Sequence, residues 1–178
     1  MSSLGRLTRV LQPPAQPLEV TTASNWQLVQ EQLGIILPED YKGFVATYGT
    51  GAVDDFLWIL SPFSGNDHLN LLKQATVRTD AQRQFSQAAG VENPYALYPQ
   101  AGGLFPWAIT DNGDVLYWLC DGLPSTWAIV VCDSQSSHWQ QFQMSTCEFL
   151  TELIMKTIVV RAFPTDFPEE PSKFIAMN

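Results

Sequence analysis

The sequence predicts a single α+β domain in which an antiparallel β-sheet of about four to six strands, connected as a meander, carries helices mainly on one side. Three observations predict this class. Apolar residues repeat at helical spacing in the first half of the chain and again near its end. Between residues 104 and 142 the pattern changes to short apolar runs separated by turns. The length of 178 residues fits one domain that buries a core without disulfides.

Three segments are expected along the chain. Residues 1–23 are predicted to form a short helix and then a proline-rich linker. Residues 24–160 are predicted to form the α+β domain. Residues 161–178 are predicted to be a proline-rich tail, and we expect the part from Phe163 to lie outside the core because its prolines break regular elements.

Two adjacent helices are predicted at the start of the domain. Ser24 and Gln27 have the spacing of a capping box, and Gly34 stands where a left-handed C-terminal cap belongs. The second helix begins near Pro38. Its inward face is predicted to carry Tyr41, Phe44, Val45 and Tyr48.

The middle of the chain predicts one strand, one helix and a loop. Residues 56–60 are wholly apolar and are predicted to form a buried strand. A helix is predicted over residues 68–89, with Leu69, Leu72, Thr76 and Thr79 on one stripe, followed by Phe85 and Ala88. Residues 91–103 contain prolines and a Gly-Gly pair, which are typical of a loop.

The predicted meander follows. Residues 104–109 and 115–120 flank Asn112-Gly113, which is a strong hairpin signal because both residue types tolerate a positive φ. Further strands are predicted over residues 127–132 and 138–142, and a capping box from Ser145 to Glu148 predicts a final helix.

Charge and composition restrict the possible partners. The formal net charge is −9, and no cluster of Lys or Arg is present to hold a nucleic-acid backbone. No apolar run approaches the roughly 20 residues of a membrane span, and the first residues do not read as a signal peptide. We therefore expect a cytoplasmic protein that binds neither nucleic acid nor membrane. The acidity suits a basic partner, although acidity also aids solubility.

No catalytic, cofactor or metal motif is found. Cys120, Cys132 and Cys147 lie in apolar settings that predict buried, reduced thiols, with a Cys120–Cys132 disulfide as the less favoured alternative. His68 and His138 lack the tight ligand spacing of a zinc site. We expect a binding protein with no enzyme activity, no cofactor and no metal.

Three segments match one known family in their order and spacing. The first runs from Trp26 to Gly51 and contains Leu37-Pro38-Glu39-Asp40-Tyr41 and Tyr48-Gly49-Thr50-Gly51. The second runs from Phe105 to Asp114 and is followed by Tyr117-Trp118. The third runs from Ser145 to Leu150. Together they resemble the SUKH superfamily, whose founding eukaryotic member regulates yeast cell-wall synthesis. The resemblance covers roughly residues 24–155. Each motif also has a fold-making explanation as a cap, a helix start or a hairpin turn.

The resemblance implies an immunity protein of a bacterial polymorphic-toxin system. Such a protein binds and neutralises a cognate toxin, here expected to be basic and of the nuclease type. Two alternatives stay open: a regulatory or scaffold module of the same fold, and a small-ligand-binding protein. Neither the identity of the toxin nor the choice between monomer and homodimer follows from the sequence.

The candidate partner-binding residues are aspartates at predicted turns and tryptophans. Turn aspartates are expected to be exposed, and Trp or Tyr residues often anchor interfaces. For each Trp, packing in the core is the simpler explanation. The candidates are Asp54, Asp55, Asp111, Asp114, Trp107 and Trp118.

Overall fold

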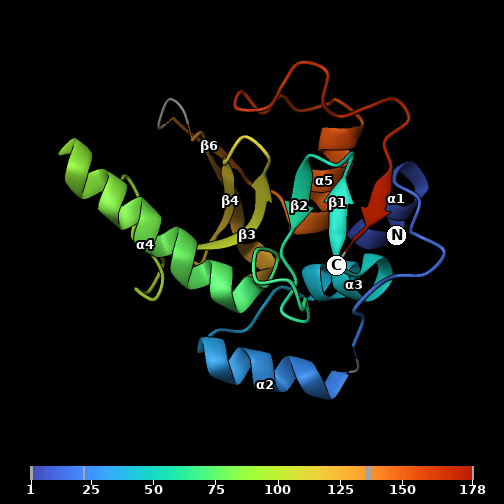
Figure 1. The fold of residues 1–178 in the computed structure, drawn as a ribbon, viewed down its shortest axis with the longest axis horizontal. Helices are drawn as coiled ribbons and strands as arrows, with labels where there is room; N and C mark the ends of the chain where they lie inside the picture. Colours follow the sequence, from blue (N-terminus) through green and yellow to red (C-terminus); the bar gives the residue numbers. More distant parts are fainter. Residues whose placement is uncertain (1, 22, 135–137, 178) are drawn as a thin grey trace.

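A computed structural model of the chain describes residues 2–21, 23–134 and 138–177. In these ranges the chain forms five α-helices, one short 3₁₀ turn and seven β-strands (Figure 1). The helical elements are α1 (Ser3–Val10), α2 (Ala23–Leu33), α3 (Glu39–Tyr48), α4 (Leu71–Ala89), α5 (Thr146–Ile154) and the 3₁₀ turn Pro124–Thr126. The strands are β1 (Gly51–Val53), β2 (Leu57–Ile59), β3 (Leu104–Thr110), β4 (Val115–Leu119), β5 (Ala128–Cys132), β6 (Trp139–Phe142) and β7 (Phe174–Ala176).

The strands form one antiparallel sheet in the order β6-β5-β4-β3-β2-β1-β7. Strands β1 to β6 are neighbours in sequence order, so the predicted meander is confirmed. The last strand, β7, returns from the C-terminus and pairs with β1. The predicted α+β class is therefore correct, with a sheet somewhat larger than expected.

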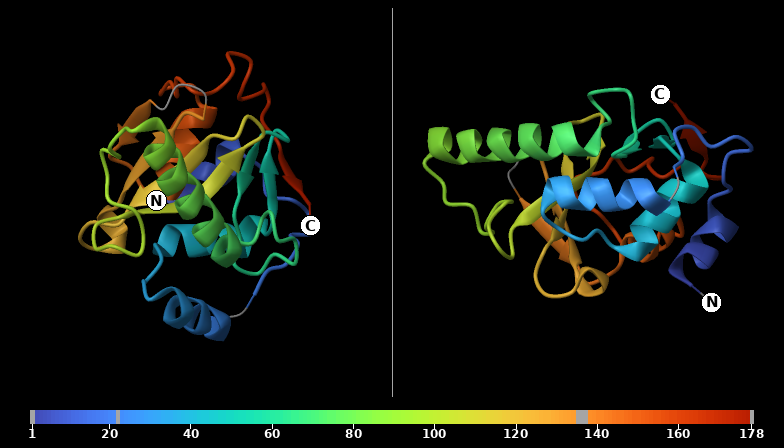
Figure 2. Two further views of the ribbon diagram at one scale, coloured as in Figure 1. Left: turned by 60° about the vertical axis from the view of Figure 1, so that its left-hand side comes forward. Right: turned by 90° about the horizontal axis from the view of Figure 1, so that it is seen from below.

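Helices cover the two faces of the sheet unequally (Figure 2). Successive residues of β4 point to opposite faces. Trp118 meets Tyr41 of α3 and Thr146 of α5. Tyr117 lies on the other face, beside Arg78 of α4. Helices α3 and α5 thus share one face with α1, which packs on α5, whereas α4 crosses the opposite face.

Trp118 is the centre of the core. It is 1% exposed, and its ring stacks on Trp107 and Phe105 and meets Tyr41 edge-on. Its indole nitrogen donates a 3.0 Å hydrogen bond to Oγ1 of Thr146, the first residue of α5. One side chain thereby joins β3, β4, α3 and α5.

Helices α2 and α3 largely follow their sequence signals. Gly34 and Gly49 both have positive φ, as the end of a helix requires. Helix α2 begins at Ala23, before the predicted cap at Ser24, whose side chain is outside the described part of the structure. The predicted capping box therefore rests on a side chain outside the described residues, and the Gln27 side chain donates to Glu31 one turn later.

The start of α5 is held by a residue that no local motif reveals. Ser145 occupies the N-cap position as predicted, but its side chain makes no capping hydrogen bond. The amide of Cys147 instead donates to Oδ2 of Asp40 at 2.8 Å. A carboxylate at a helix N-terminus is favourable because backbone donors and the helix dipole both face it. Asp40 belongs to α3, so the two helix starts are joined.

The β3–β4 hairpin forms at the predicted place with a longer turn. Only Gly113 of the Asn112-Gly113 pair has a positive φ, +88°. The amide of Gly113 donates to the Thr110 carbonyl, and the amide of Thr110 donates to the Asp114 carbonyl. This is the three-residue hairpin loop in which a glycine closes the turn.

Helix α4 starts later than predicted and ends, as predicted, at Ala89. It begins at Leu71, where the side chain of Asn70 accepts from the amides of Leu72 and Lys73. Its last turn extends past the sheet (Figure 2), and Phe85 and Ala88 are exposed.

The C-terminal segment is part of the core. Phe174 of β7 is 7% exposed and packs edge-on against Phe44 and Tyr48. Phe163 and Phe167 also contact buried residues. The expectation that this segment lies outside the core is wrong, because pairing with β1 buries an aromatic ring that the proline pattern concealed.

Comparison of two stacked tryptophans tests the role of the central hydrogen bond. The indole nitrogen of Trp118 has Thr146 as acceptor, whereas that of Trp107 is buried without an acceptor among the described residues. Trp118→Phe should lower the free energy of unfolding by about 1–3 kcal/mol more than Trp107→Phe, since only the first breaks a buried hydrogen bond. Urea unfolding of both variants measures the difference, and equal losses would contradict the assignment.

Truncation of the last strand's anchor tests the C-terminal packing. Phe174→Ala should lower the free energy of unfolding by about 3–5 kcal/mol, the usual loss for a buried phenylalanine. The matched control is Met177→Ala, because Met177 follows β7 and is exposed. It should change stability by less than about 0.5 kcal/mol. A Phe174→Ala loss as small as that of the control, in thermal or urea unfolding, would show that the segment is not packed on the domain.

Candidate protein-binding surface

Two of the predicted aspartates form the turn between β1 and β2. Asp54 and Asp55 both have φ near +52°, and the amide of Phe56 donates to the carbonyl of Val53. Two consecutive residues of positive φ define the turn that matches the twist of a hairpin, and Asp is among the residues that tolerate it. Asp55 is exposed at the tip, and Asp54 is half-buried.

The carboxylate of Asp54 holds the C-terminal segment. Its Oδ2 accepts from the amide of Glu169 at 2.9 Å, and its Oδ1 accepts from the amide of Lys173 at 2.7 Å. The backbone amide of Asp54 donates to the carbonyl of Lys173. Asp54 is therefore a structural residue, and through it residues 169–173 lie against the β1–β2 turn.

Asp111 lies beside the same turn. Its amide donates to the carbonyl of Phe56 at 3.2 Å, which joins the β3–β4 loop to the β1–β2 turn. Its Oδ1 accepts a 2.7 Å hydrogen bond from the indole nitrogen of Trp58. Asp111 is exposed, so it presents a carboxylate next to a half-buried tryptophan.

The other three candidates are buried. Asp114 is 1% exposed, because its carboxylate accepts from the Thr110 hydroxyl and from the amide of Ser134. The expectation that Asp114 is exposed is wrong. Trp107 and Trp118 are likewise inside the core and present no surface to a partner. Core packing was the simpler explanation for both.

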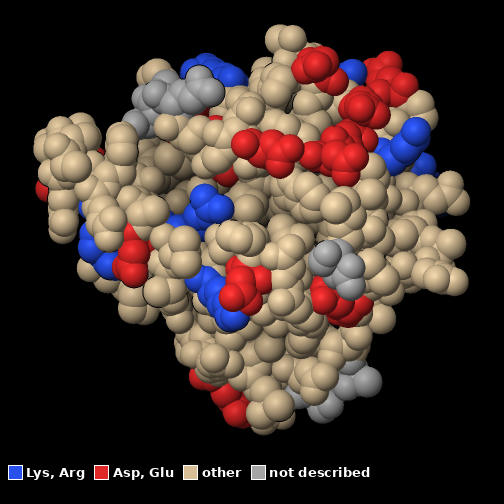
Figure 3. Space-filling view, in the orientation of Figure 1, with Lys and Arg blue, Asp and Glu red and all other residues tan. Residues whose placement is uncertain are grey.

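The surface carboxylates around the β1–β2 turn form what we call the acidic rim. Figure 3 shows acidic side chains gathered over this end of the sheet, with a few basic side chains at the borders. Glu170 pairs with Lys156 at 2.9 Å, and this pair lowers the pKa of Glu170. The rim consists of Asp54, Asp55, Asp111, Glu169 and Glu170, together with Asp166, which precedes the Phe167 that packs on Phe56.

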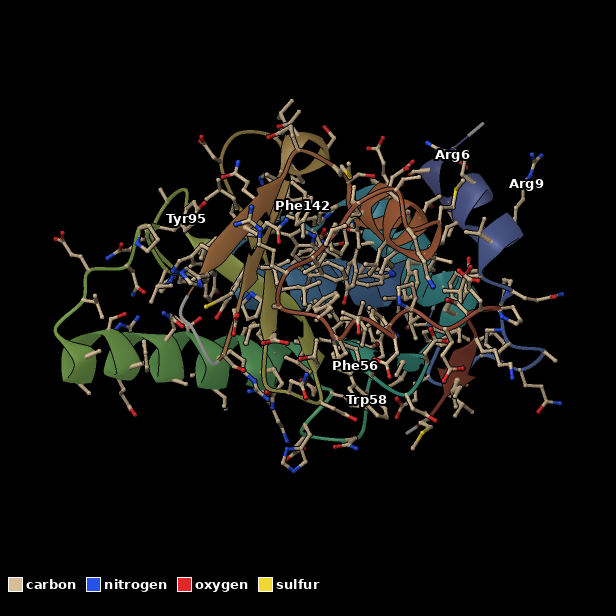
Figure 4. All side chains as sticks on the ribbon, turned by 90° about the horizontal axis from the view of Figure 1, so that it is seen from above. Arg6, Arg9, Phe56, Trp58, Tyr95 and Phe142 are labelled. Carbon is tan, nitrogen blue, oxygen red and sulfur yellow. The ribbon has the colours of Figure 1, made fainter. Side chains whose placement is uncertain are left out.

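Two half-buried aromatic side chains accompany the acidic rim. Phe56 packs against Phe163 and Phe167 of the C-terminal segment. Trp58 lies two residues further along β2, and Figure 4 shows the two side chains near each other at one border of the molecule. No sequence signal distinguished Phe56 or Trp58 from core residues; only the absence of a helix over this part of the sheet leaves them accessible.

The cysteines have no features of a reactive site. All three are free, and burial raises the pKa of Cys120 and of Cys132 to about 12 and that of Cys147 further still. They are thiols rather than nucleophilic thiolates at neutral pH. Cys132 pairs with Val115, whereas Cys120 lies beyond the opposite end of the β4–β5 pair, so the alternative of a disulfide between them is wrong.

Comparison with known proteins identifies the family. A family model, SUKH_6, described as SMI1-KNR4 cell-wall, matches residues 23–150, well over half of the chain. The chain belongs to the SUKH family. Domains of this family are immunity or regulatory proteins. No curated protein and no solved structure gives a match.

The SUKH match ends within α5. It includes the β1–β2 turn and Asp111, but not Asp166, Glu169 or Glu170. The acidic rim therefore combines residues of the family region with residues of the C-terminal segment. Within the described ranges, no helix is long and apolar enough to cross a membrane, and no group of three or more His, Cys, Asp or Glu residues is arranged to hold a metal ion.

A pair of aspartate variants tests the attachment of the C-terminal segment. Asp54→Asn keeps a residue that tolerates positive φ but replaces an accepting oxygen with a donor, so one of the two bonds to the segment is lost. We expect faster amide hydrogen exchange at Glu169 and Lys173. Asp55 has the same backbone conformation, and among the described residues its side chain makes no hydrogen bond to the segment, so Asp55→Asn should leave that exchange unchanged. Equal amide exchange rates in the two variants would show that Asp54 does not anchor the C-terminal segment.

Proposed function

We propose that this chain is an immunity protein that neutralises a bacterial toxin by binding it through the acidic rim. Membership of the SUKH family supports the class of function. The observation that carries the choice of surface is the convergence of three separate segments, the β1–β2 turn, the β3–β4 loop and residues 166–170, on one end of the sheet.

The charge of the acidic rim indicates the partner's chemistry. Like charges held close together repel one another, and a basic partner relieves that repulsion as it binds. A toxin that cleaves nucleic acid needs a basic surface for its substrate. The proposed partner is therefore a basic toxin of the nuclease type, met in the cytoplasm, and blocking that surface would prevent substrate binding.

The aromatic side chains beside the acidic rim supply the other component of an interface. A specific complex buries roughly 800 Å² on each partner, and aromatic anchors near its centre contribute most of the affinity. Phe56 and Trp58 are half-buried and fixed by neighbouring contacts, so they lose little conformational freedom when covered.

The experiment first asks whether a toxin gene adjoins the gene of this chain, and then uses the toxin domain which that gene encodes. Co-expression of the chain should restore growth of cells that produce the toxin domain, and the purified proteins should bind. Asp55→Lys with Glu169→Lys should lower the association rate constant by about tenfold or more at low ionic strength. The control is Glu92→Lys with Asp121→Lys, which changes the net charge equally at exposed positions far from the acidic rim.

The outcomes test the binding surface and the immunity function independently. Slower association only in the Asp55 and Glu169 variant supports the acidic rim as the binding surface. Equal slowing in both variants would mean that net charge alone acts and that the rim is the wrong surface. A wild-type chain that neither binds nor restores growth would refute the immunity function and favour a regulatory role.

A further inference from the structure

A hollow of about 340 Å³ lies next to Trp58 on the face of the sheet that α4 crosses. The indole of Trp58 and the carboxylate of Asp111 form one side of it. Leu69, Ile109 and Met177 contribute apolar surface. None of its lining residues is Lys or Arg, and those with titratable side chains are Asp111 and His68.

Trp58 is held in a fixed orientation. Its indole nitrogen donates to Oδ1 of Asp111 at 2.7 Å, and this bond joins the side chains of β2 and the β3–β4 loop. Because the ring is only half-buried, part of it stays accessible from the hollow. Among the described residues no group donates to Oδ2 of Asp111, so that oxygen can accept a hydrogen bond from a ligand.

We propose that this hollow receives an arginine side chain of the toxin. The inference rests on the proposed function and specifies the chemistry of its interface. A planar guanidinium stacks on the face of Trp58 while it donates a charge-assisted hydrogen bond to Oδ2 of Asp111. The aliphatic part of the arginine then covers Leu69 and Ile109, which are nearly buried already.

The geometry favours arginine over lysine. A guanidinium is weakly hydrated, stacks on aromatic rings and offers several donors in one plane, whereas an ammonium is a strongly hydrated point charge. The hydrogen bond between Trp58 and Asp111 keeps the aromatic ring and the carboxylate side by side in the wall of the hollow. The hollow therefore selects for the shape of the cation as well as for its charge.

A peptide titration tests the hollow without the toxin. The probe is the tripeptide Gly-Arg-Gly with blocked ends, and the matched control carries citrulline, which has nearly the same shape but no charge. The readout is the indole NMR resonance that Trp58→Phe removes from the spectrum of the ¹⁵N-labelled chain. The arginine peptide should shift this resonance saturably, at least about tenfold more tightly than the citrulline peptide.

Asp111→Asn supplies the second variant. It keeps an oxygen that can accept from the Trp58 indole, and it removes the charge that the guanidinium needs. Binding of the arginine peptide should weaken to the level of the citrulline peptide. Equal binding of both peptides, shifts confined to other tryptophans such as Trp139, or an unchanged affinity in Asp111→Asn would each overturn the proposal.

The toxin itself supplies the last measurement. Trp58→Ala should weaken toxin binding by about thirtyfold or more, the effect typical of an interface anchor, whereas Phe85→Ala on the distant half of α4 should change it less than twofold. If the wild-type chain does not bind the toxin, the proposed function fails, and the peptide titration still decides the hollow. If the toxin binds equally to Trp58→Ala and wild type, the hollow is not its anchor although the immunity function stands.

Discussion

The carboxylate of Asp40 joins the first turns of α3 and α5, and the rest of the fold depends on that joint. Oδ2 accepts from the amide of Cys147, and the next residue, Tyr41, packs edge-on against Trp118. Trp118 in turn donates to Thr146 at the start of α5. A buried helix start needs partners for its free amides. Here a neighbouring helix and the central strand supply them, so the helix layer and the sheet are positioned together.

The same rigidity explains how like charges are held at one end of the sheet. The β1–β2 turn, the β3–β4 loop and the C-terminal segment are each fixed by backbone hydrogen bonds, so their carboxylates cannot move apart. Exposed ion pairs such as Lys156–Glu170 are weak and offset little of the repulsion.

Sequence periodicity predicted the elements that depend on local patterns. The helices at Tyr41–Tyr48 and after Ser145, the hairpin at Gly113 and the meander all follow from residues within one or two turns of each other. The features that sequence periodicity did not predict depend on contacts between residues far apart in the chain. Strands β1 and β7 have three residues each, too few to show alternation, and they are defined by pairing: β1 with β2 and β7, and β7 with β1. The burial of Asp114 requires the amide of Ser134.

The candidate surface was also only partly predictable, because local patterns reveal turns but not the contacts between distant turns. Turn chemistry placed Asp55 and Asp111 on the exterior, but nothing local indicates that the two turns adjoin, or that Asp54 anchors residues 169–173. The SUKH match contains the joint at Asp40, whereas part of the acidic rim and the Met177 wall of the hollow come from beyond it. Phe174 packs the C-terminal segment against the core, so this segment is ordered before any partner binds. A surface ordered in advance loses less entropy on binding, and the C-terminal segment can therefore contribute to affinity as well as to charge.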